Sequence, residues 1–273
     1  MRDFVLKLYR LLFARECFYR LNRLLHLCSL SGLGVLNYEN SRVSGEKTFL
    51  REFFKTRHND IVLDVGANVG DYSRLILALN PHARVYAFEP HPRTYKVLAN
   101  NLDGLMVDAY NVAAGECDGI LTLYDYEAND GSEHASLYKD TIEYLRHAKA
   151  VAHEVKVINL DKFLRGKNIE SVSLLKIDTE GHELAVLKGA KHYISSGKIR
   201  AIHFEFNDSN VSSRTYFRDF WDFLPNYTLY RLLPNGMVKI KSYDPIFCEV
   251  FAYQNVVAIL NHSNGIRLKA GLK

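Results

Sequence analysis

A short apolar run that ends in a glycine turn constrains this chain more than any other part of its sequence. Residues 61–65 (IVLDV) lead into Gly66, Asn68 and Gly70, and a second apolar run over residues 85–88 ends in Glu89. In an open α/β sheet, such a turn links a buried strand to a helix start, and the carboxylate after the neighbouring strand accepts hydrogen bonds from ribose hydroxyls. The pattern therefore predicts a doubly wound α/β fold that binds a nucleotide-containing ligand.

The glycine spacing indicates which ligand to expect. A turn that holds a dinucleotide pyrophosphate follows the pattern GxGxxG, because the second glycine lets the phosphates approach the backbone. Here Asn68 occupies that second position, and only Gly66 and Gly70 match. The Asn68 side chain would crowd a pyrophosphate, but it can hydrogen-bond to the polar end of an amino acid. We therefore expect S-adenosylmethionine rather than NAD.

Residues around this turn have specific expected roles. A helix that begins near Asp71 directs free backbone N–H groups at the ligand, and Asp71 itself either caps the helix or approaches the ligand's ammonium group. Asp64 is expected to organise the turn through hydrogen bonds, and residues 111–113 to lie near the adenine. The predicted cofactor-binding residues are Gly66, Ala67, Asn68, Gly70, Asp71, Tyr72, Glu89, Pro90, Asn111, Ala113 and Asp178.

From residue 60 onward, short apolar runs alternate with helical patterns, which predicts one large α/β domain. We expect a seven-stranded, doubly wound, Rossmann-like sheet. The last strand is expected to run antiparallel, since no clear helix precedes it to provide a parallel crossover. The predicted strands are 61–66, 84–89, 106–112, 172–178, 200–206, 227–233 and 254–260, and the predicted helices lie near 71–79, 92–102, 183–194 and 214–224.

The domain organisation follows from the segments outside this alternation. Residues 1–44 form a helical extension, and residues 45–273 form the catalytic domain. Within it, residues 113–170 are read as an insertion with extra strands at 120–124 and 155–158. A polar loop over residues 129–135, called the acceptor loop below, is expected together with Ser136 to contact the acceptor substrate, although an ordinary surface loop would have the same composition.

Composition excludes some classes of protein. The chain has 273 residues, of which 48% are hydrophobic, and a formal charge of +4, so it resembles neither a disordered protein nor a nucleic-acid-binding one. Its four cysteines, at positions 17, 28, 117 and 248, lack the spacing of a metal site and are read as reduced packing residues.

The N-terminal segment differs from the rest of the chain. Residues 1–23 read as one basic, partly amphipathic helix, in which Arg15 interrupts the apolar stripe. Charges recur too often for a membrane span, and acids in the lead-in disfavour a signal peptide. Two interpretations of residues 1–38 stay open: packing on the chain's own domain or on a second copy, and peripheral contact with an anionic membrane.

Four sequence blocks resemble the FkbM family of class I S-adenosylmethionine-dependent methyltransferases. They are VLDVGANVG at 62–70, AFEP at 87–90, NVAAG at 111–115 and above all LKIDTEGHE at 175–183, followed by LKGA at 187–190. The resemblance covers about residues 45–260 and leaves the first 38 residues outside. It implies a seven-stranded O-methyltransferase with a reversed last strand, acting on a hydroxyl of a sugar or a secondary metabolite.

The chemistry of methyl transfer points to a polar cluster at the ends of two strands. An acceptor hydroxyl must be held in line with the methyl group and must lose its proton during attack. Asp178, Glu180, His182 and Glu205 are the predicted catalytic residues. His182 is the natural candidate base, Glu180 either orients it or acts as the base itself, and Glu183 is read as a first-turn helix carboxylate.

A divalent metal would also lower the acceptor's pKa, and Asp178, Glu180, His182, His203 and Glu205 offer suitable ligand atoms. Because no compact metal-ligand spacing is present, no metal ligands are predicted.

The favoured hypothesis is S-adenosylmethionine-dependent O-methylation of a sugar hydroxyl, in a cell-surface or lipid-linked glycan. The expected location is the cytoplasm, with peripheral contact at the inner face of the membrane as an extension of this hypothesis. The alternatives are methylation of a soluble natural product and a non-catalytic scaffold of the same fold. The sequence makes no prediction of oligomeric state.

Overall fold

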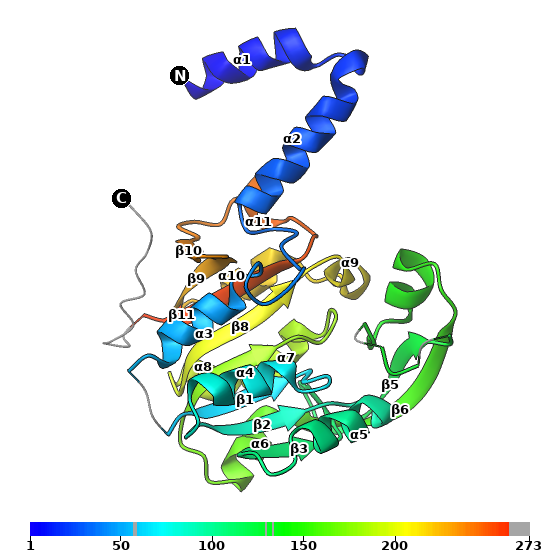
Figure 1. Cartoon of the computed structure of the whole chain (residues 1–273), viewed down its shortest axis with the longest axis vertical. Helices are drawn as coiled ribbons and strands as arrows, with labels where there is room; N and C mark the ends of the chain where they lie inside the picture. The colour runs from blue at the N-terminus through cyan, green and yellow to red at the C-terminus, as the bar shows by residue number, and fades with distance from the viewer. Residues whose placement is uncertain (57–58, 129, 133, 262–273) are drawn as a thin grey trace.

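The computed structural model describes residues 1–56, 59–128, 130–132 and 134–261, and its centre is an eight-stranded sheet (Figure 1). The strand order is β10-β9-β11-β8-β7-β1-β2-β3. Residues 129, 133 and 262–273, which the sequence assigned to the acceptor loop and the end of the catalytic domain, lie outside the described residues. The strands are β1 (Ile61–Val65), β2 (Arg84–Phe88), β3 (Val107–Tyr110), β7 (Val172–Ile177), β8 (Ile199–Phe206), β9 (Tyr227–Leu233), β10 (Gly236–Lys239) and β11 (Gln254–Leu260).

All seven predicted strands are present, and the reversed last strand is confirmed. Strands β3, β2, β1, β7 and β8 pair in parallel, whereas β11 pairs antiparallel with both β8 and β9. The predicted count of seven is wrong by one, because β10 adds an edge strand through a hairpin from β9. The sequence did not predict β10 because only Met237 of its four residues is buried, and such a strand needs no apolar run.

Helices cover both faces of the sheet. Helices α3 (Glu46–Phe54), α4 (Asp71–Leu79) and α5 (Pro92–Asn101) pack on one face, and α6 (Leu160–Gly166), α7 (Glu183–Gly189), α8 (Lys191–Ser195) and α10 (Phe217–Phe223) on the other. Short helices α9 (Ser209–Ser213) and α11 (Pro245–Cys248) lie in loops. The single helix predicted over 183–194 is divided at Ala190, and the one predicted from 214 begins at Phe217.

A second, smaller sheet stands beside the first (Figure 1). Its strands β4 (Ala113–Gly115), β5 (Gly119–Tyr126) and β6 (Ala150–Asn159) are arranged in the order β4-β6-β5. The segment between β5 and β6 contains the acceptor loop and a short helix, η2 (Thr141–Leu145). Helix α6 follows directly, and its Leu160 and Leu164 are buried in the core of the main domain.

The N-terminal extension projects away from the domain (Figure 1). It consists of α1 (Arg2–Phe13), η1 (Glu16–Phe18) and α2 (Tyr19–Gly32), and none of the residues in these helices is buried. Two corrections follow. Residues 1–23 form two helices rather than one, with Arg15 in the break between them, and α1 and α2 do not pack on the chain's own domain. Among the described residues, none of the helices combines the length and the apolar composition of a membrane span.

The cysteines also depart from expectation. Cys248 is buried, as predicted for a packing residue, whereas Cys17, Cys28 and Cys117 are exposed. The packing explanation therefore holds for Cys248 alone.

Candidate active site

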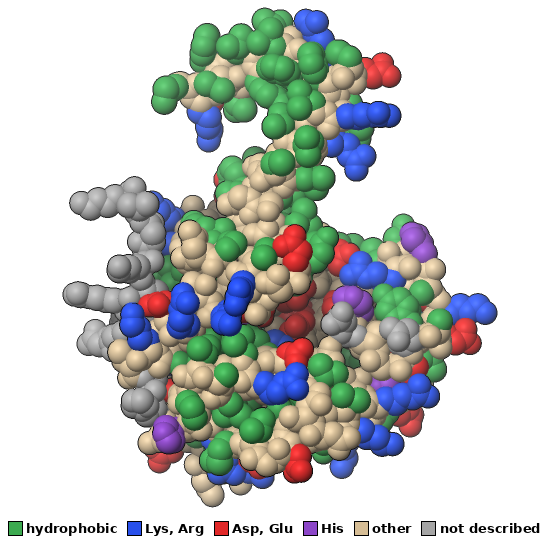
Figure 2. All heavy atoms as spheres, viewed as in Figure 1, with side chains coloured by type: hydrophobic (Ala, Val, Ile, Leu, Met, Phe, Trp, Pro, Cys, Tyr) green, Lys and Arg blue, Asp and Glu red, His purple; other side chains and the backbone are tan. Residues whose placement is uncertain are grey.

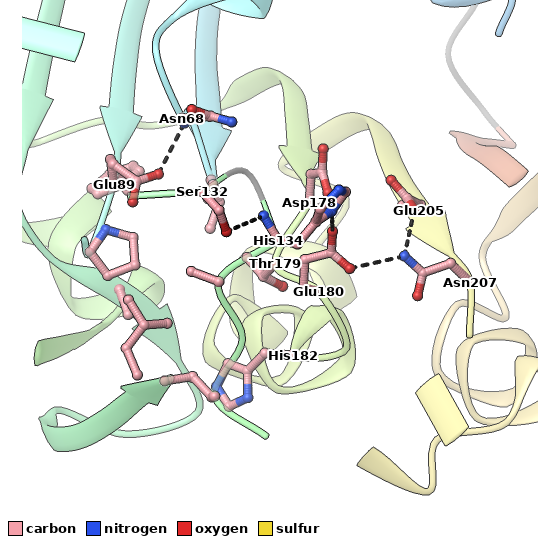
Figure 3. A pocket seen from close by; sticks show the side chains of 18 of the residues that line it. Asn68, Glu89, Ser132, His134, Asp178, Thr179, Glu180, His182, Glu205 and Asn207 are labelled. Atoms are coloured by element: carbon pink, nitrogen blue, oxygen red, sulfur yellow. Dashed lines mark hydrogen bonds and ion pairs between the residues drawn. The ribbon is translucent and has the colours of Figure 1, made fainter. Parts of the chain in front are cut away.

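A cavity of about 470 Å³ opens where the carboxyl ends of β1, β2, β7 and β8 face the smaller sheet (Figure 3). This is the edge at which open α/β sheets bind ligands. Six of the predicted cofactor-binding residues line the cavity, as do the predicted catalytic residues Glu180, His182 and Glu205. Those six are Gly66, Asn68, Glu89, Pro90, Ala113 and Asp178.

The turn after β1 requires glycine at position 66. Gly66 has a φ of +75°, and a Cβ on it would lie 1.7 Å from the carbonyl oxygen of Asp178. No side chain fits that space, and the left-handed conformation is itself costly for other residues. The backbone of β1 and the backbone after β7 therefore approach each other closely below the cavity.

Glu89 is held as a buried hydrogen-bond acceptor. Its Oε2 accepts from the backbone N–H of Asn68 at 3.0 Å, and its Oε1 accepts from the N–H of His91 at 2.8 Å. Burial raises the pKa of Glu89 to about 7. A carboxylate fixed in this way at the cavity wall suits the ribose hydroxyls of a nucleoside.

Next to Glu89 the cavity wall is apolar. Phe88, Ala113, Ala114 and Leu123 line it there and offer a surface for a flat aromatic base. Asn111 takes a supporting position, since its Nδ2 donates to the carbonyl oxygens of Glu89 and Pro90 at 2.9 Å. Together with the close turn at Gly66 and the carboxylate of Glu89, this wall fits S-adenosylmethionine.

Three of the other predicted cofactor residues lie outside the main cavity. Ala67, Asp71 and Tyr72 line a neighbouring hollow rather than the main cavity. Asp71 makes no side-chain cap, is 76% exposed and pairs with Arg74. The hydroxyl of Tyr72 is 2.8 Å from His203 Nδ1.

Gly70 packs against helix α5. A Cβ at Gly70 would lie 3.0–3.1 Å from the side chains of Leu98 and Leu102. The structure thus places Gly70 in helix packing rather than at the cavity wall.

A buried cation beneath the turn was not assigned a role from the sequence. Lys176 Nζ donates to the carbonyl oxygen of Gly66 at 3.0 Å and lies 3.4 Å from carboxylate oxygens of both Asp64 and Asp178. Asp64 is fully buried and also accepts from Ser73 Oγ at 2.6 Å, as expected of a residue that organises the turn. The position of Lys176 inside an apolar strand could have indicated a buried ion pair, because lysine is almost never buried without a partner.

Glu180 is the most strongly positioned carboxylate of the cavity. Its backbone has a φ of +51°, a strained conformation for a residue other than glycine. Its carboxylate accepts from His134 Nδ1 at 3.1 Å, Asn207 Nδ2 at 3.2 Å and Ser209 Oγ at 2.8 Å. These three donors fix the direction of the carboxylate, and Figure 3 shows His134 and Asn207 beside it.

His182 lies apart from Glu180 (Figure 3), so the expectation that Glu180 orients it is wrong. The partner of Glu180 is His134 instead. His182 Nδ1 is 3.4 Å from the hydroxyl of Tyr138, and its buried Nε2 has no hydrogen-bond partner among the described residues. Burial lowers the pKa of His182 to about 4, which makes it neutral but weakly basic near pH 7.

The other two glutamates of the cluster have different roles. Burial, reinforced by the charges of Asp178 and Glu180, raises the pKa of Glu205 well above its usual range, which favours the neutral form of this carboxyl group. Asn207 Nδ2 donates to its Oε1. Glu183 accepts from the backbone N–H groups of Thr179 and Gly181 at 3.0 Å, which agrees with its predicted role at the helix start.

Hydrogen bonds hold the acceptor loop beside the part of the cavity that contains Glu89. Asp130 Oδ1 accepts from His91 Nε2 at 2.8 Å and from His153 Nε2 at 2.7 Å. Ser132 and His134 then line the cavity, while Glu133 lies outside the described residues. The histidines thus hold this loop against α5 and β6, a connection that the sequence did not reveal.

The same three residues, His91, Asp130 and His153, are the one group within residues 1–56, 59–128, 130–132 and 134–261 whose ligand atoms converge as metal ligands do. The backbone N–H of Arg93 donates to His91 Nδ1 at 3.3 Å, so Nε2 of the neutral ring carries the proton. Hydrogen bonds thus connect all three side chains of this group.

Comparison with known proteins identifies the family. Residues 64–232 match the model of the methyltransferase FkbM domain. The chain is 26% identical to the 2-O-methyltransferase NoeI of Sinorhizobium fredii, with 65% of this chain and 76% of NoeI covered. It is 28% identical to the hexuronic acid methyltransferase AglP of Haloferax volcanii, with 56% of this chain and 59% of AglP covered. A solved O-methyltransferase from Bacillus cereus, in complex with SAH, covers 93% of this chain and 95% of its own, with 12% identity and a TM-score of 0.44.

Proposed function

Because the chain belongs to the FkbM methyltransferase family, we propose that it is an S-adenosylmethionine-dependent O-methyltransferase whose acceptor is a sugar hydroxyl in a cell-surface or lipid-linked glycan. The observation that carries the chemistry is the pairing of Glu180 with His134 at the cavity wall.

Residues of this chain would hold the cofactor at three points. The turn at Gly66 leaves room for the amino-acid end, Glu89 accepts from the ribose, and the apolar wall around Leu123 receives the base. When bound, S-adenosylmethionine supplies a methyl group on a positively charged sulfur. The residues that remain for catalysis are those on the opposite side of the cavity.

Glu180 and His134 are arranged as a carboxylate–histidine pair. A carboxylate that accepts from Nδ1–H fixes the ring tautomer, so Nε2 of neutral His134 carries the lone pair. In the proposed reaction the acceptor oxygen would receive the methyl group that S-adenosylmethionine supplies, and His134 Nε2 would accept the hydroxyl proton. Glu180 then stabilises the positive imidazolium.

His182 and Glu205 are less suited to take the proton. The buried ring of His182, with its pKa of about 4, is a weak base near neutral pH, and the raised pKa of Glu205 favours its neutral form. Both line the cavity and are placed to shape the acceptor site.

The sugar as acceptor is supported by the lining of the cavity and by the relatives. Tyr38 and Tyr253 offer aromatic faces, and Ser132 and Asn207 offer hydrogen-bonding groups, which together are suited to a polyhydroxylated ring. One relative is named as a hexuronic acid methyltransferase and another as a 2-O-methyltransferase.

The proposal is tested by measuring transfer of labelled methyl from S-adenosylmethionine to a panel of glycans and soluble natural products. Transfer to a sugar hydroxyl supports it, and transfer only to a non-sugar natural product would overturn the glycan assignment. Cofactor binding without turnover on any acceptor would favour the scaffold alternative.

The assignment of the base is tested separately with variants. Glu180→Gln and His134→Gln should each lower kcat by about 100-fold, and the double variant should lose little more, because paired groups act as a unit. His182→Ala should cost less than about tenfold. A larger loss in His182→Ala than in His134→Gln would reassign the base to His182.

A further inference from the structure

The N-terminal extension carries apolar side chains that nothing in the described structure covers. Helix α1 lies farthest from the domain, across the end of α2 (Figure 1). Phe4 and Leu11 of α1 are 69% and 68% exposed, and Leu24 of α2 is 57% exposed. Contiguous exposed apolar surface of this kind is rare on a protein that meets only water.

The division into two helices makes α1 strongly amphipathic. Asp3, Lys7 and Arg10 are spaced by four and three residues, so they form one narrow polar line along the helix. Phe4, Leu8 and Leu11 have the same spacing on an apolar face. Arg15, which interrupts that face if residues 1–23 are drawn as one helix, lies outside α1.

The N-terminal extension also differs from the domain in its net charge. Residues 1–32 contain six of the chain's 35 lysines and arginines but only two of its 31 acids, so the other residues carry 29 of each. The whole formal charge of +4 therefore lies on the extension. Figure 2 shows these basic side chains around the apolar ones at the far end of the molecule.

The residues that directly follow the extension attach it to the rim of the cavity. Buried Val35 pairs with Gln254 at the start of β11, and the N–H of Leu36 donates to the carbonyl oxygen of Tyr253 at 2.7 Å. Tyr38 then packs edge-on against Tyr253, and both line the cavity. A surface bound by the extension would consequently be held near the entrance for the acceptor.

We propose that the N-terminal extension, residues 1–32, docks this protein on an anionic phospholipid surface. Helix α1 lies in the plane of the interface with Phe4, Leu8 and Leu11 among the acyl chains, and its basic residues face the lipid phosphates. With 12 residues, α1 is too short to span the bilayer. The proposal goes beyond the catalytic assignment and does not depend on it.

The net charge of the extension favours an anionic membrane over a second copy of the chain as its binding partner. Two extensions packed together would bring twelve basic side chains against four acids, and like charges at an interface oppose association. An anionic membrane instead complements both the apolar face and the charge.

The test is co-sedimentation of the full chain with vesicles of pure phosphatidylcholine and of phosphatidylcholine mixed with phosphatidylglycerol. We expect binding to the anionic vesicles at least about tenfold tighter than to the neutral ones, and weaker binding at high salt, because the attraction of basic residues is screened. Equal binding to both lipids, or no binding to either, would overturn the proposal.

Two double variants separate the two contributions. Phe4→Ser with Leu8→Ser removes apolar contact without adding charge, and Lys7→Gln with Arg10→Gln removes charge alone. Each should weaken binding to anionic vesicles by about tenfold or more. The matched control, Ile120→Ser with Val238→Ser, alters exposed apolar residues of the domain and should bind like the unmodified chain.

Sedimentation analysis of the same variants supplies the competing outcome. If the unmodified chain forms a dimer that Phe4→Ser with Leu8→Ser dissociates, while vesicle binding is the same in all proteins, the extension is an interface between copies and the proposal is wrong. Because no residue of α1 is buried, these variants should fold, which circular dichroism checks.

Discussion

Replacing Lys176 by methionine should destabilise the fold by about 3–5 kcal/mol, because the change leaves the carboxylate of Asp64 buried without its cation. Asp64 is fully buried, and Ser73 donates to its Oδ2. Its Oδ1 has no hydrogen-bond partner among the described residues and faces Lys176 Nζ at 3.4 Å. The variant therefore isolates the ion pair beneath the glycine turn.

The upper part of this range follows from the chemistry of Asp64. Without Lys176, the cheapest way to relieve the buried charge is to bind a proton, which near pH 7 costs about 4 kcal/mol for a carboxyl with an ordinary pKa of about 4. For a domain of this size, a loss of 3–5 kcal/mol lowers the melting temperature by about 6–20 °C. Binding of S-adenosylmethionine should weaken as well, since Lys176 also holds the Gly66 carbonyl and Asp178.

The assay is denaturant unfolding of the variant and the unmodified chain, with Lys191→Met as the matched control. Lys191 is exposed at the start of α8, so its replacement should change the free energy of unfolding by less than about 0.5 kcal/mol. The deficit of Lys176→Met should also depend on pH. Once Asp64 is protonated in both the folded and the unfolded chain the deficit vanishes, so it should be smaller near pH 5 than near pH 8.

Two results would refute this reasoning. A deficit below about 1 kcal/mol near pH 7 would mean that Asp64 does not depend on Lys176 for its stability in the core. A deficit that is large but identical near pH 5 and near pH 8 would attribute the loss to packing of the lysine stem rather than to the unpaired carboxylate.

Three further predictions concern function. Because burial raises the pKa of Glu89 to about 7, its carboxylate gains a proton as the pH falls through that value, and S-adenosylmethionine should bind more weakly below about pH 7. Calorimetry should show that this pH dependence disappears in Glu89→Gln. An unchanged pH profile in this variant would contradict the ribose role of Glu89. Glu205→Gln should keep kcat within about threefold, because the raised pKa of Glu205 favours the neutral form that glutamine resembles, whereas a loss of about 100-fold in steady-state assays would make it a base. His153→Ala should release Asp130 and the acceptor loop, and so raise the KM for the acceptor several-fold while the Kd for the cofactor stays unchanged. An equal effect on both constants would show that the loop also holds the cofactor.

The cofactor side of the site could be read from the sequence because its determinants are local. The glycine turn and the carboxylate of Glu89 each follow an apolar strand directly, and parallel strands bring such ends to one edge of a sheet. Local pattern also gave the strands of the main sheet, while β10 was missed because just one of its residues is buried.

The polar side of the site could not be read in this way. His134 meets Glu180 across 46 positions of sequence, and Asp130 is held by His91 and His153 from two other elements. These partners depend on how the smaller sheet stands beside the larger one, which no local pattern encodes. The sequence accordingly offered His182 as the base, and only burial, which lowers its pKa, showed how weakly basic it is.

By itself, then, the sequence determined the α/β class, the reversed last strand and the kind of cofactor, because strand periodicity, turn glycines and strand-end carboxylates act over a few neighbouring residues. The tertiary structure decided which carboxylate faces which histidine, that Lys176 neutralises Asp64 beneath the turn, and that α1 and α2 stand clear of the domain. Those outcomes depend on burial and on distances between remote segments, which are set only when the whole chain has folded.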